Sequence, residues 1–111
     1  MNRYVTELVG TFFLVFTIGM SVTAGHAMAP IAIGLGLTAL VYMGGHVSGA
    51  HYNPAVTVGF LLAGGVDRRD VAPYIAAQIF GAWLAATSVQ YVTAEAFAAA
   101  PGPGYAFAHV L

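Results

Sequence analysis

The residues best suited to chemistry gather in one short stretch, residues 48–53, followed directly by Pro54 and Ala55. Asn53 carries a side-chain amide with two N–H donors and a carbonyl acceptor. Asparagine is a favoured N-cap and proline fits the first helical position, so we predict a helix that starts at Asn53. The start of a helix carries a partial positive charge of about half an elementary unit. Amide donors at such a point can bind and orient the oxygen of a small polar solute.

The four residues before Asn53 are predicted to form a non-helical loop that offers acceptors. They are Gly49, Ala50, His51 and Tyr52. Non-helical backbone at membrane depth is tolerated only where it is buried in protein or lines a wet cavity. Carbonyls that lead to an amide donor would orient a water molecule, and the positive helix end would repel cations and hydronium. The alternative is that the motif merely caps an ordinary helix, but the uncharged surroundings favour a pore.

Composition places the chain among membrane proteins. Of its 111 residues 59% are apolar and 6% are charged, and no Asp, Glu, Lys or Arg occurs between Leu8 and Val66. Soluble domains carry about a quarter charged residues, so a polytopic membrane protein in a lipid bilayer is predicted. The net charge of −1, without a basic cluster, argues against nucleic acid as a partner. Arg3 before an apolar run could imitate a signal peptide, but the run from Leu8 to Gly25 is long and is interpreted as a span.

The apolar pattern predicts an all-α membrane protein with three transmembrane helices and one re-entrant half-helix. The three spans are expected at residues 4–23, 29–46 and 71–92. The half-helix is expected at residues 53–63, since the thirteen residues from Pro54 to Val66 reach only about 20 Å. A hydrocarbon core is about 30 Å thick. Residues 67–70 are predicted to form a short polar loop.

The charges favour this topology and fix its orientation. With a re-entrant half-helix, Arg3, Arg68 and Arg69 lie on one side of the membrane and Glu95 lies on the other. The positive-inside rule then puts the N-terminus in the cytoplasm, and we expect a multi-pass protein of the cell (inner) membrane. If residues 54–66 crossed completely, Arg3 would lie opposite the Arg68–Arg69 pair.

Three motifs in order resemble one known family. Residues 48–57, with the sequence SGAHYNPAVT, resemble the first signature loop of the aquaporins and glycerol facilitators, the major intrinsic proteins. Residues 6–16 resemble the first helix of that family, and residues 74–82 resemble its third. The resemblance implies the first repeat of an inverted-repeat fold over residues 1–98. Residues 99–111 would then be the inter-repeat loop and the start of a fourth span.

The resemblance also implies a function and pore residues. The family forms passive channels for water or small neutral solutes, usually homotetramers with one pore in each protomer. Asn53 would be the pore donor at the midplane, with Pro54 and Ala55 completing the motif. Ile33 falls where the family has an outer constriction residue, often aromatic or His. An aliphatic residue there leaves the choice between water, glycerol, ammonia and another neutral solute open.

Two further roles are implied for residues that support the loop. Glu7 would be a buried carboxylate that accepts hydrogen bonds from the loop backbone, and His51 would brace the same loop. From residue chemistry alone, Glu7 is equally an interfacial charge near a helix end. The side chain of Gln78 could equally form a hydrogen bond between two helices or belong to the pore. His46 and His51 have no third ligand nearby, so no metal site is predicted, and no set of catalytic residues or cofactor site is recognised.

A pore of this kind needs two half-helices that meet from opposite sides, and this sequence contains one. The missing second repeat could follow in a longer channel, could be an inverted copy of the chain, or could be absent from a non-conducting remnant. All three arginines fall on one predicted side, which counts against dual insertion. We therefore favour the first half of a channel and expect no conduction by the 111 residues alone. The alternatives are half of an inverted-repeat secondary transporter, for which Glu7 is the one candidate coupling residue, and an anchoring subunit.

Overall fold

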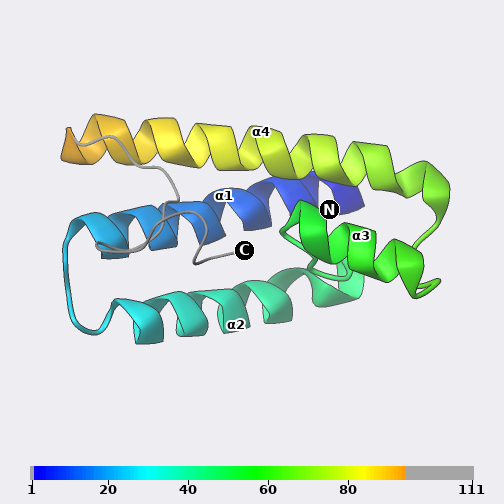
Figure 1. The fold of residues 1–111 in the computed structure, drawn as a ribbon, viewed down its shortest axis with the longest axis horizontal. Coiled ribbons are helices and arrows are strands. Elements are labelled where there is room, and N and C mark those ends of the chain that lie inside the picture. The colour runs from blue at the N-terminus through cyan, green and yellow to red at the C-terminus, as the bar shows by residue number, and fades with distance from the viewer. Residues whose placement is uncertain (1, 95–111) are drawn as a thin grey trace, which may run out of the picture.

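The computed structural model describes residues 2–94, which fold into four helices without a strand. The helices are α1 (Arg3–Thr23), α2 (Ala29–Ser48), α3 (Pro54–Leu62) and α4 (Arg68–Thr93) (Figure 1). This confirms the all-α fold expected from the sequence. The expected inter-repeat loop and fourth span at residues 99–111 lie outside the described residues, as does Glu95.

Three helices are long and apolar enough to cross a membrane. α1, α2 and α4 have 21, 20 and 26 residues, and each contains an 18-residue stretch whose mean hydropathy is 1.8, 1.5 and 1.2 respectively. α3 has 9 residues and reaches only about 14 Å, less than half of a hydrocarbon core. The short third helix expected from the position of Pro54 is therefore present.

Two helix boundaries differ from the sequence-based expectation. The prediction of a polar loop at residues 67–70 is wrong, because Asp67 caps α4 and the next residues form its first turn. The Oδ1 atom of Asp67 accepts the backbone N–H of Arg69 at 2.9 Å, so charged residues that suggested a loop instead start a helix. α2 continues past residue 46 to Ser48, because the left-handed residue that ends it is Gly49, with φ of 87°, and not an earlier glycine.

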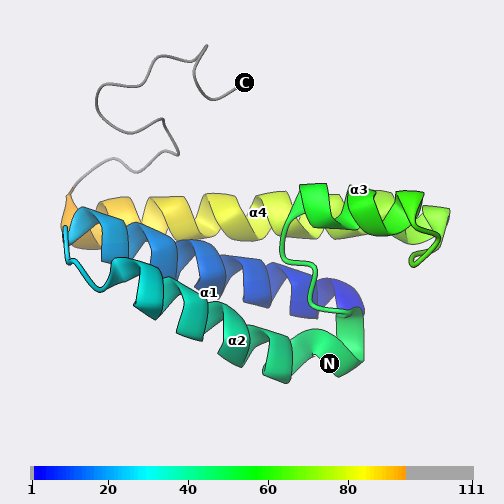
Figure 2. The ribbon, with the colours of Figure 1, turned by 60° about the horizontal axis from the view of Figure 1, so that its bottom comes forward.

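The helices form an asymmetric bundle around α1. α1 packs against both α2 and α4, and α3 packs against α4 (Figures 1 and 2). The start of α1, the end of α2 and the start of α4 lie at one end of the bundle, where α3 is also found (Figure 2). Gly81 lets α1 and α4 approach closely, since an added Cβ would overlap the carbonyl oxygen of Leu8.

The interior holds many polar side chains and the surface many large apolar ones, unlike a soluble domain. Glu7, Thr57 and Gln78 are completely buried, whereas Leu62 and Tyr91 are 83% and 90% exposed. Buried polar groups require hydrogen-bond partners, so the core has to be a connected network. That network holds the loop between α2 and α3.

Candidate functional site

Glu7 on α1 anchors the loop that joins α2 to α3. Its Oε1 atom accepts hydrogen bonds from Ser48 Oγ at 2.7 Å and from the backbone N–H of His51 at 3.0 Å. Its Oε2 atom accepts the backbone N–H of Tyr52 at 2.7 Å and Gln78 Nε2 at 2.9 Å. Both oxygens face donors only, which suits an ionised carboxylate because it has no proton to donate. A buried charge is tolerated where such bonds replace its water shell.

The loop turns all its amide groups toward the protein. The N–H of Gly49 bonds to the carbonyl of Gly45, and the N–H of Ala50 bonds to Ser48 Oγ at 3.1 Å. The next two N–H groups are those that bond to Glu7. The carbonyl oxygens of residues 49–52 receive no hydrogen bond from any residue between 2 and 94. The loop therefore has four carbonyl acceptors without a partner among the described residues.

This arrangement requires unusual backbone geometry. Gly49, Ala50 and Tyr52 have φ angles of 87°, 51° and 53°, all in the left-handed region. For a residue other than glycine this region costs about 1 to 2 kcal/mol. The carboxylate of Glu7 offsets that cost by bonding to the two amides that follow Ala50. The strain is thus held at the loop by a charge on another helix.

Asn53 lies at the start of α3 with its amide donors free. Its Oδ1 atom accepts the backbone N–H of Ala55 at 2.8 Å, which caps the helix. That bond fixes the orientation of the amide, so both side-chain N–H groups point away from the cap. They have no partner within the described part of the chain, and the residue is exposed. Pro54 takes the first position of α3, as its missing N–H allows.

A second set of contacts ties the loop to α3 and α4. His51 Nδ1 lies 2.9 Å from Thr57 Oγ1, and Gln78 Nε2 also donates to that hydroxyl at 2.9 Å. The ring of His51 stacks on the ring of Phe60, with a centroid distance of 4.5 Å and an interplanar angle of 1°. Thr57 therefore joins the imidazole to the amide that bonds Glu7. Within residues 2–94, Gln78 Oε1 has no hydrogen-bond partner.

Two tyrosines fix the loop from either side. Tyr52 donates its hydroxyl to the carbonyl of Leu40 at 2.7 Å, and its ring occupies space left by Gly10 and Gly44. Tyr74 donates its hydroxyl to the carbonyl of Ser48 at 2.8 Å. The end of α2 and the loop are thereby pinned to both α1 and α4.

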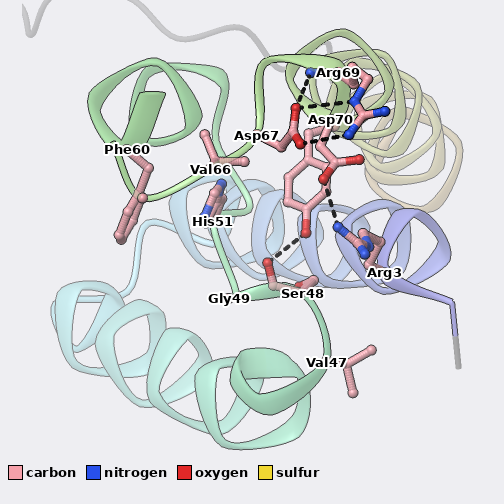
Figure 3. A pocket seen from close by; sticks show the side chains of 12 residues that line it. Arg3, Val47, Ser48, Gly49, His51, Phe60, Val66, Asp67, Arg69 and Asp70 are labelled. Carbon is pink, nitrogen blue, oxygen red and sulfur yellow. Dashed lines mark hydrogen bonds and ion pairs between the residues drawn. The ribbon is translucent and has the colours of Figure 1, made fainter. Parts of the chain in front are cut away.

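A polar cavity of about 680 Å³ opens beside the loop at the arginine-bearing end of the bundle. Its wall includes Gly49 and His51 on one side and Arg3 and Asp70 on the other (Figure 3). Arg3 Nη1 pairs with Asp70 Oδ2 at 2.6 Å, which joins the start of α1 to the start of α4. Gly49 and His51 therefore place part of the loop at the wall of this cavity.

The electrostatics of this rim are set by short-range hydrogen bonds. The backbone N–H of Arg69 and then its side chain hold the pKa of Asp67 below its usual value. Asp70 uses both oxygens, since Tyr4 donates its hydroxyl to Oδ1 at 2.7 Å while Arg3 pairs with Oδ2. No group of three or more His, Cys, Asp or Glu side chains that could hold a metal ion occurs among residues 2–94.

The structure brings most of the predicted site residues together. Glu7 and Gln78 contact the loop network, with Pro54 and Ala55 at the adjoining helix start. Ile33 is different, because it lies near the beginning of α2, about 22 Å along the helix from Ser48. The sequence reasoning missed Thr57 and Tyr74. The position of Thr57 one turn after Asn53 was the available signal.

Comparisons with known proteins agree on one family. The chain matches the family model for Major intrinsic protein over residues 1–110. It is 39% identical over 103 residues to Aquaporin Z of Rhodopseudomonas palustris, a match that covers 85% of this chain and 42% of that protein. It is 41% identical over 93 residues to Glycerol uptake facilitator protein-like 6 of Lactiplantibacillus plantarum, covering 81% and 43% respectively. Aquaporin NIP1-2 of Arabidopsis thaliana is 39% identical over 98 residues, covering 81% and 33%. The chain therefore spans less than half the length of these relatives.

Proposed function

Because the chain belongs to the major intrinsic protein family, we propose that it forms one half of a passive transmembrane channel for water or small neutral solutes. The observation that carries the proposal is the polarity of the loop. All four amides of residues 49–52 bond inward, and their carbonyl oxygens are left without a partner among residues 2–94. These acceptors lead to the free amide donors of Asn53.

A permeating water molecule would exchange its hydrogen bonds with bulk water for bonds to this loop. It would donate to successive carbonyl oxygens and then accept from the side-chain N–H groups of Asn53. At that point its oxygen faces the donors, so its own hydrogens point away along the pore. Such an arrangement interrupts the uniform donor-to-acceptor chain that proton hopping along water requires.

Charge exclusion follows from α3. The partial positive charge at the start of α3 lies beside Asn53, and it would disfavour cations and hydronium. No acidic residue occurs between Leu8 and Val66 to offset it. Glu7 does not act as a pore charge in this mechanism, because its two oxygens are bonded to the loop from inside the protein. The chain is proposed to have no enzymatic activity.

A complete pore would need a second half-helix that faces α3 from the other side of the membrane. We propose that a second repeat provides it, and that the complete channel is a homotetramer with a pore in each protomer. The channel would lie in the inner membrane of the cell. The end of the bundle that carries the arginines would face the cytoplasm, as the positive-inside rule favours.

The test replaces the matching part of Aquaporin Z from Rhodopseudomonas palustris with this chain, so that the relative supplies the rest of the protein. Osmotic shrinkage of proteoliposomes is followed by stopped-flow light scattering. Asn53→Asp keeps an oxygen to cap Ala55 but removes both amide donors. We expect water permeability to fall about tenfold, since one hydrogen bond is worth about 1 to 1.5 kcal/mol.

The matched control is Asn2→Asp. Asn2 caps α1 through an equivalent bond from Tyr4 N at 2.7 Å but lies outside the loop. We expect Asn2→Asp to leave permeability unchanged. Equal permeability of the Asn53→Asp and unmodified grafts would contradict the proposed pore role. A flux that depends on a proton or sodium gradient would instead support a secondary transporter.

A further inference from the structure

An apolar groove lies on the outer surface of the bundle between α3 and α4. Its volume is about 750 Å³, and it is separate from the polar cavity beside the loop. Leu61 of α3 forms one wall, and the α4 residues that line it are Val71, Ala72, Ile75, Ala76 and Ile79. The groove therefore lies on the face of a helix that is long and apolar enough to span a membrane.

The groove is lined by one cationic side chain, that of Arg68. Arg68 at the first position of α4 is its one charged lining residue. The other two arginines are neutralised, since Arg3 pairs with Asp70 and Arg69 pairs with Asp67. Arg68 is exposed and has no ion-pair partner within residues 2–94. A lone guanidinium above an apolar groove is complementary to a molecule with an anionic head and a hydrocarbon tail.

The groove has the length of one lipid leaflet. Arg68 and Ile79 are separated by about 16 Å along α4, at about 1.5 Å per residue. Half of a hydrocarbon core of about 30 Å is about 15 Å. An acyl chain that starts at the level of Arg68 would therefore end near Ile79, at the bilayer midplane.

We propose that this groove binds one anionic phospholipid, with an acyl chain along α3 and α4 and its phosphate at Arg68. A guanidinium matches a phosphate with two parallel N–H donors. One arginine near the membrane surface changes the affinity for anionic lipid by about fivefold. A zwitterionic phospholipid can lay its acyl chain in the same groove, but its ammonium group cancels the attraction of its phosphate. The site therefore selects by headgroup charge.

The chain carries its own reporter for this site. Trp83 is the single tryptophan, is 58% exposed, and lies one helical turn beyond Ile79 on the same face of α4. The 111-residue chain is placed in vesicles of phosphatidylcholine with increasing phosphatidylglycerol, and one of the two lipids carries brominated acyl chains. Quenching of Trp83 fluorescence then gives the relative binding constant of the two lipids. We expect phosphatidylglycerol to be preferred about fivefold.

Three variants test the site. Arg68→Gln is expected to reduce the preference to within about twofold of unity. Arg69→Gln is the matched control, because it removes the same charge from the next residue, which does not line the groove, and it should retain the preference. Ala76→Phe fills the groove and should also abolish the preference. Far-UV circular dichroism establishes that each variant has kept its helices.

Each other outcome would overturn the proposal. Equal losses in Arg68→Gln and Arg69→Gln would mean a diffuse surface-charge effect. An unchanged preference in Arg68→Gln would exclude the arginine as the headgroup ligand. A preference that Ala76→Phe leaves unchanged would mean that another protein segment covers the groove, or that the lipid binds elsewhere.

Discussion

The replacement Glu7→Gln tests whether one carboxylate holds the loop in place. The change keeps the size and shape of the side chain but turns one acceptor oxygen into an NH₂ donor. Each oxygen of Glu7 accepts from one side chain and one backbone N–H. In either orientation of the new amide, the NH₂ group therefore faces one such pair of donors. Ser48 and Gln78 can rotate to accept from it, but the backbone N–H groups of His51 and Tyr52 cannot.

At least one buried backbone N–H is therefore left without an acceptor. Such a group costs about 1 to 3 kcal/mol, and the remaining bonds lose the strength that the charge gave them. The expected destabilisation is about 2 to 4 kcal/mol, a factor of roughly 30 to 1,000 in the unfolding equilibrium. The cost of the left-handed backbone angles in the loop would no longer be offset. The free energy of local opening around Ala50 should therefore fall more than the free energy of global unfolding.

The measurement is equilibrium unfolding in mixed micelles with increasing dodecyl sulfate, followed by far-UV circular dichroism. Asp67→Asn is the matched acid-to-amide control, because asparagine caps a helix as well as aspartate does, and it should change stability far less. A cycle that combines Glu7→Gln with Ser48→Ala should show coupling above about 0.5 kcal/mol. A Glu7→Gln chain as stable as Asp67→Asn would refute the anchoring role of the carboxylate.

Four further substitutions probe the hydrogen-bond network, the contact between α1 and α4, and the rim of the polar cavity. Thr11 Oγ1 is buried without a partner within residues 2–94, so Thr11→Val should be neutral or stabilising, whereas Thr57→Val should cost about 1 to 3 kcal/mol in the same unfolding assay. Gly81→Val should force α1 and α4 apart and lower the thermal midpoint by circular dichroism; an unchanged midpoint would contradict the close contact. The lowered pKa of Asp67 stabilises the fold above the ordinary carboxyl pKa of about 3.9, and this contribution should disappear as the pH falls through the lower folded value. The difference in stability between the unmodified chain and Asp67→Asn, measured from pH 6 to pH 3, should shrink accordingly.

The sequence predicted the large features of the fold because they depend on length and hydropathy. The three long helices and the short helix that begins at Pro54 follow from uncharged segments and a proline at a helix start. The charged residues after Val66 were misinterpreted, because their composition suggested a loop. They form the start of a helix, since the side chain of Asp67 caps α4. Capping depends on one bond to Arg69 N, which a charge pattern does not reveal.

The site was less predictable where it depends on depth and on backbone angles. Residue chemistry left Glu7 undecided between an interfacial and a buried position, since a sequence does not show how deep a helix end lies. The structure gives it no exposed surface. The left-handed angles at Ala50 and Tyr52 were not expected, because neither residue favours them and the bonds that impose them come from another helix.

The hydrogen bonds of Glu7 also set an order of assembly during synthesis. Its partner Ser48 follows 41 residues later and its partner Gln78 follows 71 residues later. When the first helix enters the membrane, the carboxylate has neither partner, so we expect it to stay close to the aqueous surface. The short helix likewise has no docking surface until α4 has been made, since α4 is the helix against which it packs. We therefore expect the loop to insert late and cooperatively, and a chain truncated before Gln78 to leave its half-helix at the membrane surface.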